Sequence, residues 1–78
     1  MRTLTLRRAV ALADGMVEVT LILLNADSAD QEFVLPPPAF DWTMLLDSAL
    51  PETQACPLDS DRARVGAYGV MLLTVRLP

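Results

Sequence analysis

The stretch MVEVTLILLN, residues 16–25, decides the fold of this chain. In its first half, apolar and polar residues alternate, and in its second half both alternating sets are apolar. A period of two is typical of a β-strand with one buried face. The stretch therefore predicts a long strand whose far half is buried on both faces, or nearly so.

A turn signal, Asp14-Gly15, comes directly before this strand. The apolar residues 9–13 precede the turn, and we expect them to pair with the long strand as a β-hairpin.

Further strands are predicted after the long one, each separated from the next by residues that favour turns. They are expected at residues 31–35, 41–47, 62–65 and 70–77. A polar cluster, three prolines, a long loop at residues 48–61 and two glycines separate them. No stretch shows a helical period, so the sequence predicts an all-β fold, a small antiparallel β-sandwich that forms one domain over residues 1–78. The side chains expected in its core are Leu21, Leu23, Phe33, Trp42, Leu46, Met71, Leu73 and Val75.

The overall composition excludes several classes of partner. The chain has 78 residues and a net charge of -4, with six basic residues that form no continuous stripe. A nucleic-acid partner is therefore not expected, because phosphate binding needs a basic surface. The longest apolar run, residues 21–24, is too short to cross a membrane. A single cysteine, Cys56, cannot form an internal disulfide, which favours the reducing cytoplasm.

Catalytic and metal-binding residues are not predicted, and no cofactor is expected. The chain has no histidine, the commonest general acid–base group. Two acidic pairs, Asp27/Asp30 and Asp59/Asp61, lie in turn-rich loops, where aspartate is common because it bonds the backbone. A calcium loop at residues 59–61 lacks the other ligands of such a site. Cys56 has no histidine to activate it as a nucleophile.

The aromatic residues offer little for carbohydrate binding. Trp42 is in phase with Met44 and Leu46, so we expect it in the core. Tyr68, which lies between two glycines, and Phe40 remain as candidate glucan contacts.

Three segments resemble a known family when taken together. They are LILLNA at residues 21–26 with EFVLP at 32–36, WTMLLDSA at 42–49, and VGAYGVMLL at 65–73. Their order and spacing resemble the C-terminal β-domain of bacterial glycogen debranching enzymes, the isoamylase-like branch of the α-amylase superfamily. The match spans residues 17–75, and residues 1–12 have no counterpart in it.

The resemblance implies a non-catalytic accessory domain at the C-terminal end of a larger enzyme. In that family the catalytic carboxylates lie in an upstream (β/α)₈ barrel, which needs about 250 residues, so none is carried onto this chain. The implied partners are that barrel and, through the parent enzyme, glycogen or a limit dextrin cut at α-1,6 branch linkages. Two alternatives stay open: a standalone carbohydrate-binding module and an immunoglobulin-like interaction module.

Overall fold

The chain forms strands and no helix in the part that the structure describes. The structure is a computed structural model that describes residues 2–36, 42–52, 54–58 and 60–78. All strand pairs are antiparallel, which confirms the predicted all-β class. The strands are β1 (Thr3–Ala11), β2 (Val17–Asn25), β3 (Gln31–Val34), β4 (Thr43–Asp47), β5 (Cys56–Pro57), β6 (Arg62–Val65) and β7 (Val70–Leu77).

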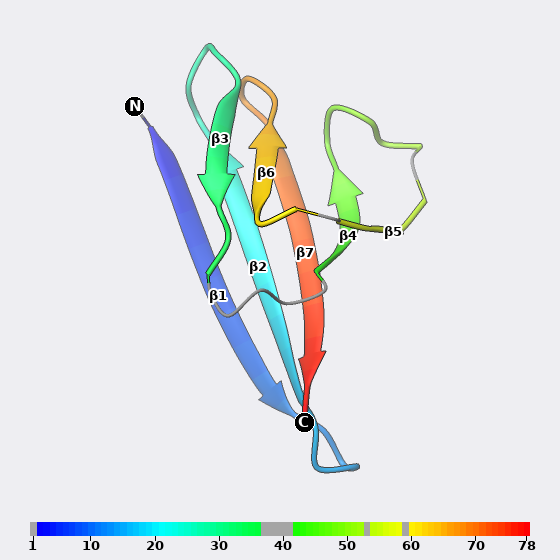
Figure 1. The fold of residues 1–78 in the computed structure, drawn as a ribbon. Coiled ribbons are helices and arrows are strands. Elements are labelled where there is room, and N and C mark those ends of the chain that lie inside the picture. The colour runs from blue at the N-terminus through cyan, green and yellow to red at the C-terminus, as the bar shows by residue number, and fades with distance from the viewer. Residues whose placement is uncertain (1, 37–41, 53, 59) are drawn as a thin grey trace.

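The strands form two layers, as predicted for a small antiparallel sandwich. The larger sheet has five strands in the order β1-β2-β7-β4-β5, and β3 pairs with β6 in a second, two-stranded sheet. Figure 1 shows β3 and β6 lying over one face of the larger sheet. The chain passes to the smaller sheet twice, after β2 and after β5, and it returns to the larger sheet before β4 and before β7.

The first hairpin is longer than the sequence predicted. β1 begins at Thr3 rather than at residue 9, and it pairs with β2 along its whole length. The turn between them closes on itself, since Leu12 N–H donates to the Met16 carbonyl at 2.7 Å and Met16 N–H to the Asp14 carboxylate at 3.0 Å. Gly15 supplies a positive φ of 84° there, which favours glycine. The predicted strand at residues 9–13 therefore extends too far into the turn.

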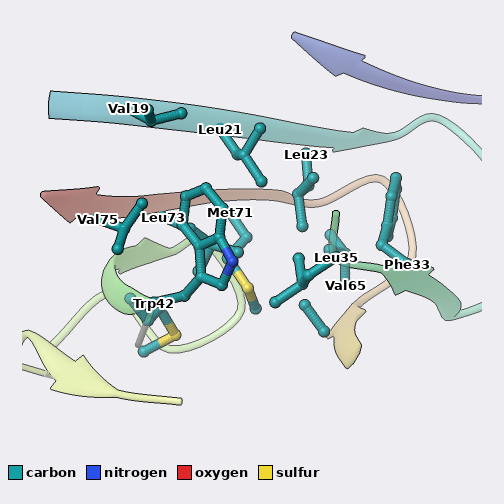
Figure 2. Close-up of a cluster of buried hydrophobic side chains, with 12 residues drawn as sticks. Val19, Leu21, Leu23, Phe33, Leu35, Trp42, Val65, Met71, Leu73 and Val75 are labelled. Carbon is teal, nitrogen blue, oxygen red and sulfur yellow. The ribbon is translucent and has the colours of Figure 1, made fainter. Parts of the chain in front are cut away.

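The core lies between the two sheets and is built from alternate side chains of each strand (Figure 2). Trp42 is 1% exposed, which confirms its predicted place in the core. β2 and β7 contribute the inward set of the larger sheet, and β3 and β6 close the core from the other side. The buried hydrophobic residues are Val19, Leu21, Leu23, Phe33, Leu35, Trp42, Met44, Ala63, Val65, Met71, Leu73 and Val75.

Leu46 is not in the core, and that prediction was wrong. The register of β4 against β7 shifts between Met44 and Leu46. A β-bulge of this kind adds one residue to a strand and moves the following side chains to the other face. Leu46 is consequently 40% exposed, and it pairs with Leu72 instead of pointing inward.

The long loop predicted at residues 48–61 contains a short strand. Cys56 pairs with Met44, so β5 forms the edge of the larger sheet next to β4. A two-residue strand that includes a proline has no alternation, which is why the pattern did not reveal it.

Candidate functional site

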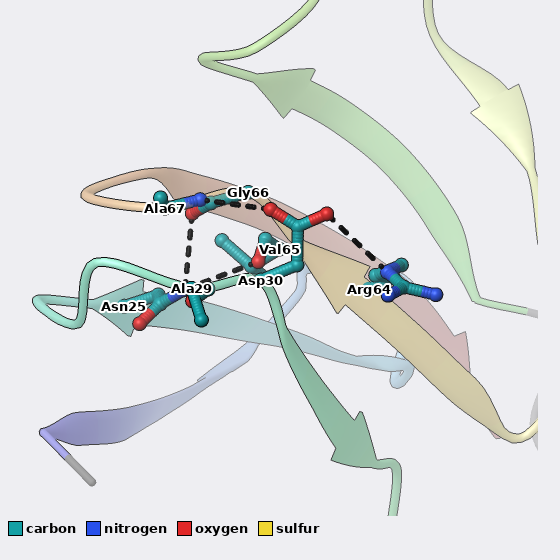
Figure 3. A network of polar contacts seen from close by, with 7 residues as sticks. All are labelled: Asn25, Ala29, Asp30, Arg64, Val65, Gly66 and Ala67. Atoms are coloured by element: carbon teal, nitrogen blue, oxygen red, sulfur yellow. Dashed lines mark hydrogen bonds and ion pairs between the residues drawn. The ribbon is translucent and has the colours of Figure 1, made fainter.

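The β2–β3 and β6–β7 crossings between the layers lie side by side and share one buried polar residue, Asn25. Its side-chain nitrogen donates to the carbonyl oxygens of Ala29 at 2.9 Å and of Val65 and Gly66 at 3.1 Å (Figure 3). Its oxygen accepts from Asp27 N–H at 2.9 Å. Asn25 is 2% exposed, so a buried amide is satisfied entirely by the backbone of these two loops.

The acidic pair Asp27/Asp30 serves the same two loops. The Asp27 carboxylate accepts from Ser28 N–H at 2.8 Å. One oxygen of Asp30 accepts from Ala67 N–H at 3.2 Å, and the other lies 3.5 Å from the Arg64 guanidinium (Figure 3). Both carboxylates thus accept hydrogen bonds from backbone N–H groups of these two loops, which is the turn role expected of them.

Tyr68, one of the two candidate glucan contacts, is 74% exposed at the tip of the β6–β7 turn. The turn is closed by Gly69 N–H donating to the Gly66 carbonyl at 2.9 Å. Tyr68 has a φ of 53°, a left-handed conformation that costs a non-glycine residue about 1–2 kcal/mol. Next to it is a shallow groove of about 340 Å³ lined by Leu24, Asn25, Ala26, Tyr68, Gly69 and Val70.

The glycine after Tyr68 is required by close packing. A Cβ at Gly69 would lie 2.7 Å from the Gly66 carbonyl oxygen and 3.2 Å from the Ser48 hydroxyl oxygen. That hydroxyl accepts from Val70 N–H at 2.8 Å, so it has little room to move.

The other predicted site residues do not gather with Tyr68. Phe40 and Asp59 lie outside the described residues, so the glucan contact expected at Phe40 stays a prediction. Cys56, in β5, is half-buried and packs against the core. Among the described residues, no three His, Cys, Asp or Glu side chains are placed to bind a metal. Within the same residues, no helix is long and apolar enough to span a bilayer.

The outer face of the five-stranded sheet, opposite β3 and β6, is apolar over half its length. Cross-strand register places the outward side chains in rows across the sheet. Leu4, Leu6 and Leu46 are 51%, 46% and 40% exposed. We call the two aliphatic rows the apolar half-face; they are Leu4, Leu24 and Val70, followed by Leu6, Ile22, Leu72 and Leu46.

The next two rows of the same face are mainly polar. Arg8, Thr20 and Thr74 form one row. In the other, Glu18 and Arg76 pair with a 3.5 Å contact between carboxylate and guanidinium, and Val10, which is 42% exposed, lies beside Glu18. The outer face therefore has an apolar half and a mainly polar half, and the mainly polar half is the one suited to contact with water.

The smaller sheet has a charged outer face. Arg62 lies 2.7 Å from Glu32, and this contact raises the pKa of Arg62 above its ordinary value. Both side chains are more than half exposed, so the pair adds little to stability. By contrast, the apolar half-face gathers three exposed leucines, Leu4, Leu6 and Leu46, on one side of the larger sheet.

This surface was missed by sequence reasoning, which expected the far half of β2 to be buried on both faces. The inward residues Leu21 and Leu23 are 1% exposed, whereas Ile22 and Leu24 are only half-buried by their neighbours. The described residues place a second layer over one face alone. The sequence did carry a sign of this surface. Residues 21–24 are apolar on both faces of the strand, and a chain with so few strands has too little material to cover both faces, which favours a surface that a partner covers.

Comparisons with protein-family models, with curated proteins and with solved structures find no match to this chain.

Proposed function

We propose that this chain is a non-catalytic accessory domain that packs its apolar half-face against a larger catalytic body. Following the resemblance, that body is the (β/α)₈ barrel of a cytoplasmic glycogen debranching enzyme, which hydrolyses α-1,6 branch linkages in glycogen or limit dextrin. The domain supports the barrel structurally and takes no part in the chemistry. The observation that carries the proposal is the apolar half-face.

Exposure of the apolar half-face to water costs free energy. Half-exposed leucines such as Leu4, Leu6 and Leu46 would each gain about 1 kcal/mol from removal of their remaining surface from water. Contiguous aliphatic surfaces of this kind mark contacts with other proteins or ligands rather than free surface. This face is an open sheet surface whose groove beside Tyr68 is shallow, and such a surface fits the broad surface of another domain better than it fits a small molecule, which needs an enclosing cleft.

A carbohydrate-binding module is the second candidate, and Tyr68 favours it. Its ring is exposed beside the groove formed by Leu24 and Val70. One aromatic stack contributes about 1–2 kcal/mol, which is less than association costs. Trp42 and Phe33 are buried and cannot add a second stack.

The genomic reading frame upstream of Met1 gives the first test. An in-frame segment that encodes a (β/α)₈ barrel is the expected result. A stop codon directly upstream, with no barrel gene beside it, would contradict the proposal.

The second test measures docking with the barrel that this frame encodes. Purified barrel and the 78-residue chain should form a one-to-one complex in size-exclusion chromatography. Leu24→Asp, in the middle of the apolar half-face, should abolish the complex. Thr20→Asp is the matched control, because it lies on the same strand and face in a polar row, and it should leave the complex intact. Equal binding by both variants would show that this face is not the docking surface.

A further inference from the structure

The free edge of β1 is a second surface, separate from the apolar half-face. β1 has β2 on one side and no neighbour on the other among the described residues (Figure 1). In an antiparallel sheet, alternate N–H and C=O groups point away from the partner strand. The outer edge of β1 therefore carries a row of backbone donors and acceptors that another strand could bind.

This edge lacks most devices that protect strand edges in other proteins. Such devices include short strands, proline, bulges and charged side chains, especially lysine, and of these β1 has only charged side chains, Arg7 and Arg8. β1 is nine residues long, contains no proline or lysine, and keeps an uninterrupted register with β2. Every residue in it is exposed. The opposite edge, β5, is by contrast two residues long and includes Pro57.

Two adjacent arginines lie in the middle of this open edge. Arg7 is opposite Leu21 and Arg8 is opposite Thr20, so neither has a carboxylate directly across β2, and Glu18, diagonal to Arg8, pairs with Arg76. The ion pairs found among the described residues involve other arginines, namely Arg62, Arg64 and Arg76. Because neighbouring residues of a strand point to opposite faces, one guanidinium flanks the edge on each side.

We propose that β1 binds an extended segment of a partner protein as an additional strand of the larger sheet, and that this segment carries adjacent acidic residues opposite Arg7 and Arg8. Backbone hydrogen bonds along the edge supply the binding, and the two charge pairs select the segment and its register. This interaction does not depend on the proposed function, since it uses the edge of the sheet rather than its face.

A second copy of the chain fits this edge poorly. Full-length antiparallel pairing of two β1 strands sets Thr3 opposite Ala11 and therefore Arg7 opposite Arg7. A parallel arrangement also brings the arginines side by side. Like charges at facing positions destabilise a strand pair, and a register that separates them shortens the ladder. The arginines thus disfavour self-pairing and favour an acidic partner.

The test is an NMR titration of the ¹⁵N-labelled chain with two capped peptides as long as β1. Both alternate valine and threonine, and their two central residues are glutamates in one and lysines in the other. The glutamate peptide should produce saturable shifts of the β1 amides and slow their exchange with solvent. The lysine peptide should bind at least about ten-fold more weakly, as should the glutamate peptide with the R7Q/R8Q double variant.

Four results would overturn the proposal. These are the absence of saturable shifts with the glutamate peptide, equal affinity for both peptides, shifts confined to the apolar half-face, and β1 shifts on dilution alone. The last would assign the edge to a second copy. If the R7Q/R8Q variant dimerises while the parent chain binds no glutamate peptide, the arginines serve only to block self-association.

Discussion

The side-chain nitrogen of Asn25 lies 3.1 Å from the carbonyl oxygen of Val65, forty residues further along the chain. This contact joins the end of β2, in the larger sheet, to the end of β6, in the smaller one. The same amide also reaches Ala29 and Gly66, so one side chain fixes two of the connections through which the chain changes layer, β2–β3 and β6–β7. The LILLNA segment on which the family resemblance partly rests thus contains, at Asn25, a residue with a specific structural task.

Replacement of this amide by a carboxylate should unfold much of the population. Asn25→Asp removes the donor that three carbonyl oxygens share and places a negative charge against them. We expect a loss of about 2–4 kcal/mol in the free energy of unfolding at pH 7, measured by urea denaturation.

The pH dependence of the same variant separates charge from shape. Burial beside carbonyl oxygens should raise the pKa of the introduced carboxyl in the folded state. The folded variant then binds its proton more tightly than the unfolded chain does, so its stability relative to the parent should be greater at pH 4 and fall as the pH rises to 7. An equal deficit at both pH values would show that the defect is steric.

Two leucine truncations should differ sharply in cost. Leu73 is fully buried in β7, and Leu73→Ala should lower the free energy of unfolding by about 2–5 kcal/mol. Leu46 follows the bulge and faces outward, so Leu46→Ala should cost only about 0.5 kcal/mol. Chemical denaturation of both variants measures the difference, and similar losses would place Leu46 in the core after all.

Tyr68→Gly should make the isolated domain more stable. The left-handed φ of 53° disfavours tyrosine, whereas glycine adopts it freely. Because the ring is largely exposed, little packing is lost, and a gain of about 1 kcal/mol is expected. Tyr68→Phe serves as the control and should leave the melting temperature unchanged. A less stable glycine variant would mean that the ring contributes more to the fold than its strain costs.

Carbohydrate assays distinguish the accessory domain from a binding module. The purified chain should release no reducing sugar from glycogen, amylopectin or pullulan. An NMR titration with maltoheptaose should show weak shifts or none, since one exposed ring contributes too little to offset the cost of association. Saturable shifts below millimolar ligand, clustered around Tyr68 or Phe40, would instead support the binding module.

Much of the strand pattern could be predicted because period and turn chemistry are local properties. β6 occupies the predicted residues 62–65, and β7 occupies 70–77. Every second residue of Val70–Leu77 from Met71 onward is apolar, Thr74 and Arg76 between them are polar, and two glycines precede the segment, so both its bounds and its inward face follow from the sequence.

The remaining features depend on how each strand pairs with its neighbours in the sheet, which the sequence of a single strand does not reveal. The bulge in β4 turns the side chain of Leu46 to the outer face of the sheet. The residue within the bulge, Leu45, is of a type common in regular strands, so the sequence does not predict the bulge. β1 has polar and apolar residues without a buried face, and it is a strand because β2 offers an edge of matching length. Prediction of the apolar half-face would have required knowing that a second sheet covers only one face of the larger sheet. Each of these is a property of cross-strand register rather than of composition.

The turn between β1 and β2 is self-contained, which makes it a practical point of attachment. Its hydrogen bonds run among residues 12–16, and Figure 1 shows it at the far end of the sheet from the β2–β3 and β6–β7 crossings. A fluorescent label or an affinity tag inserted after Asp14 would project beyond the end of the sheet, away from Asn25 and from the middle of β1. Such a handle would let surface-capture experiments present the apolar half-face and the β1 edge to candidate partners in a known orientation.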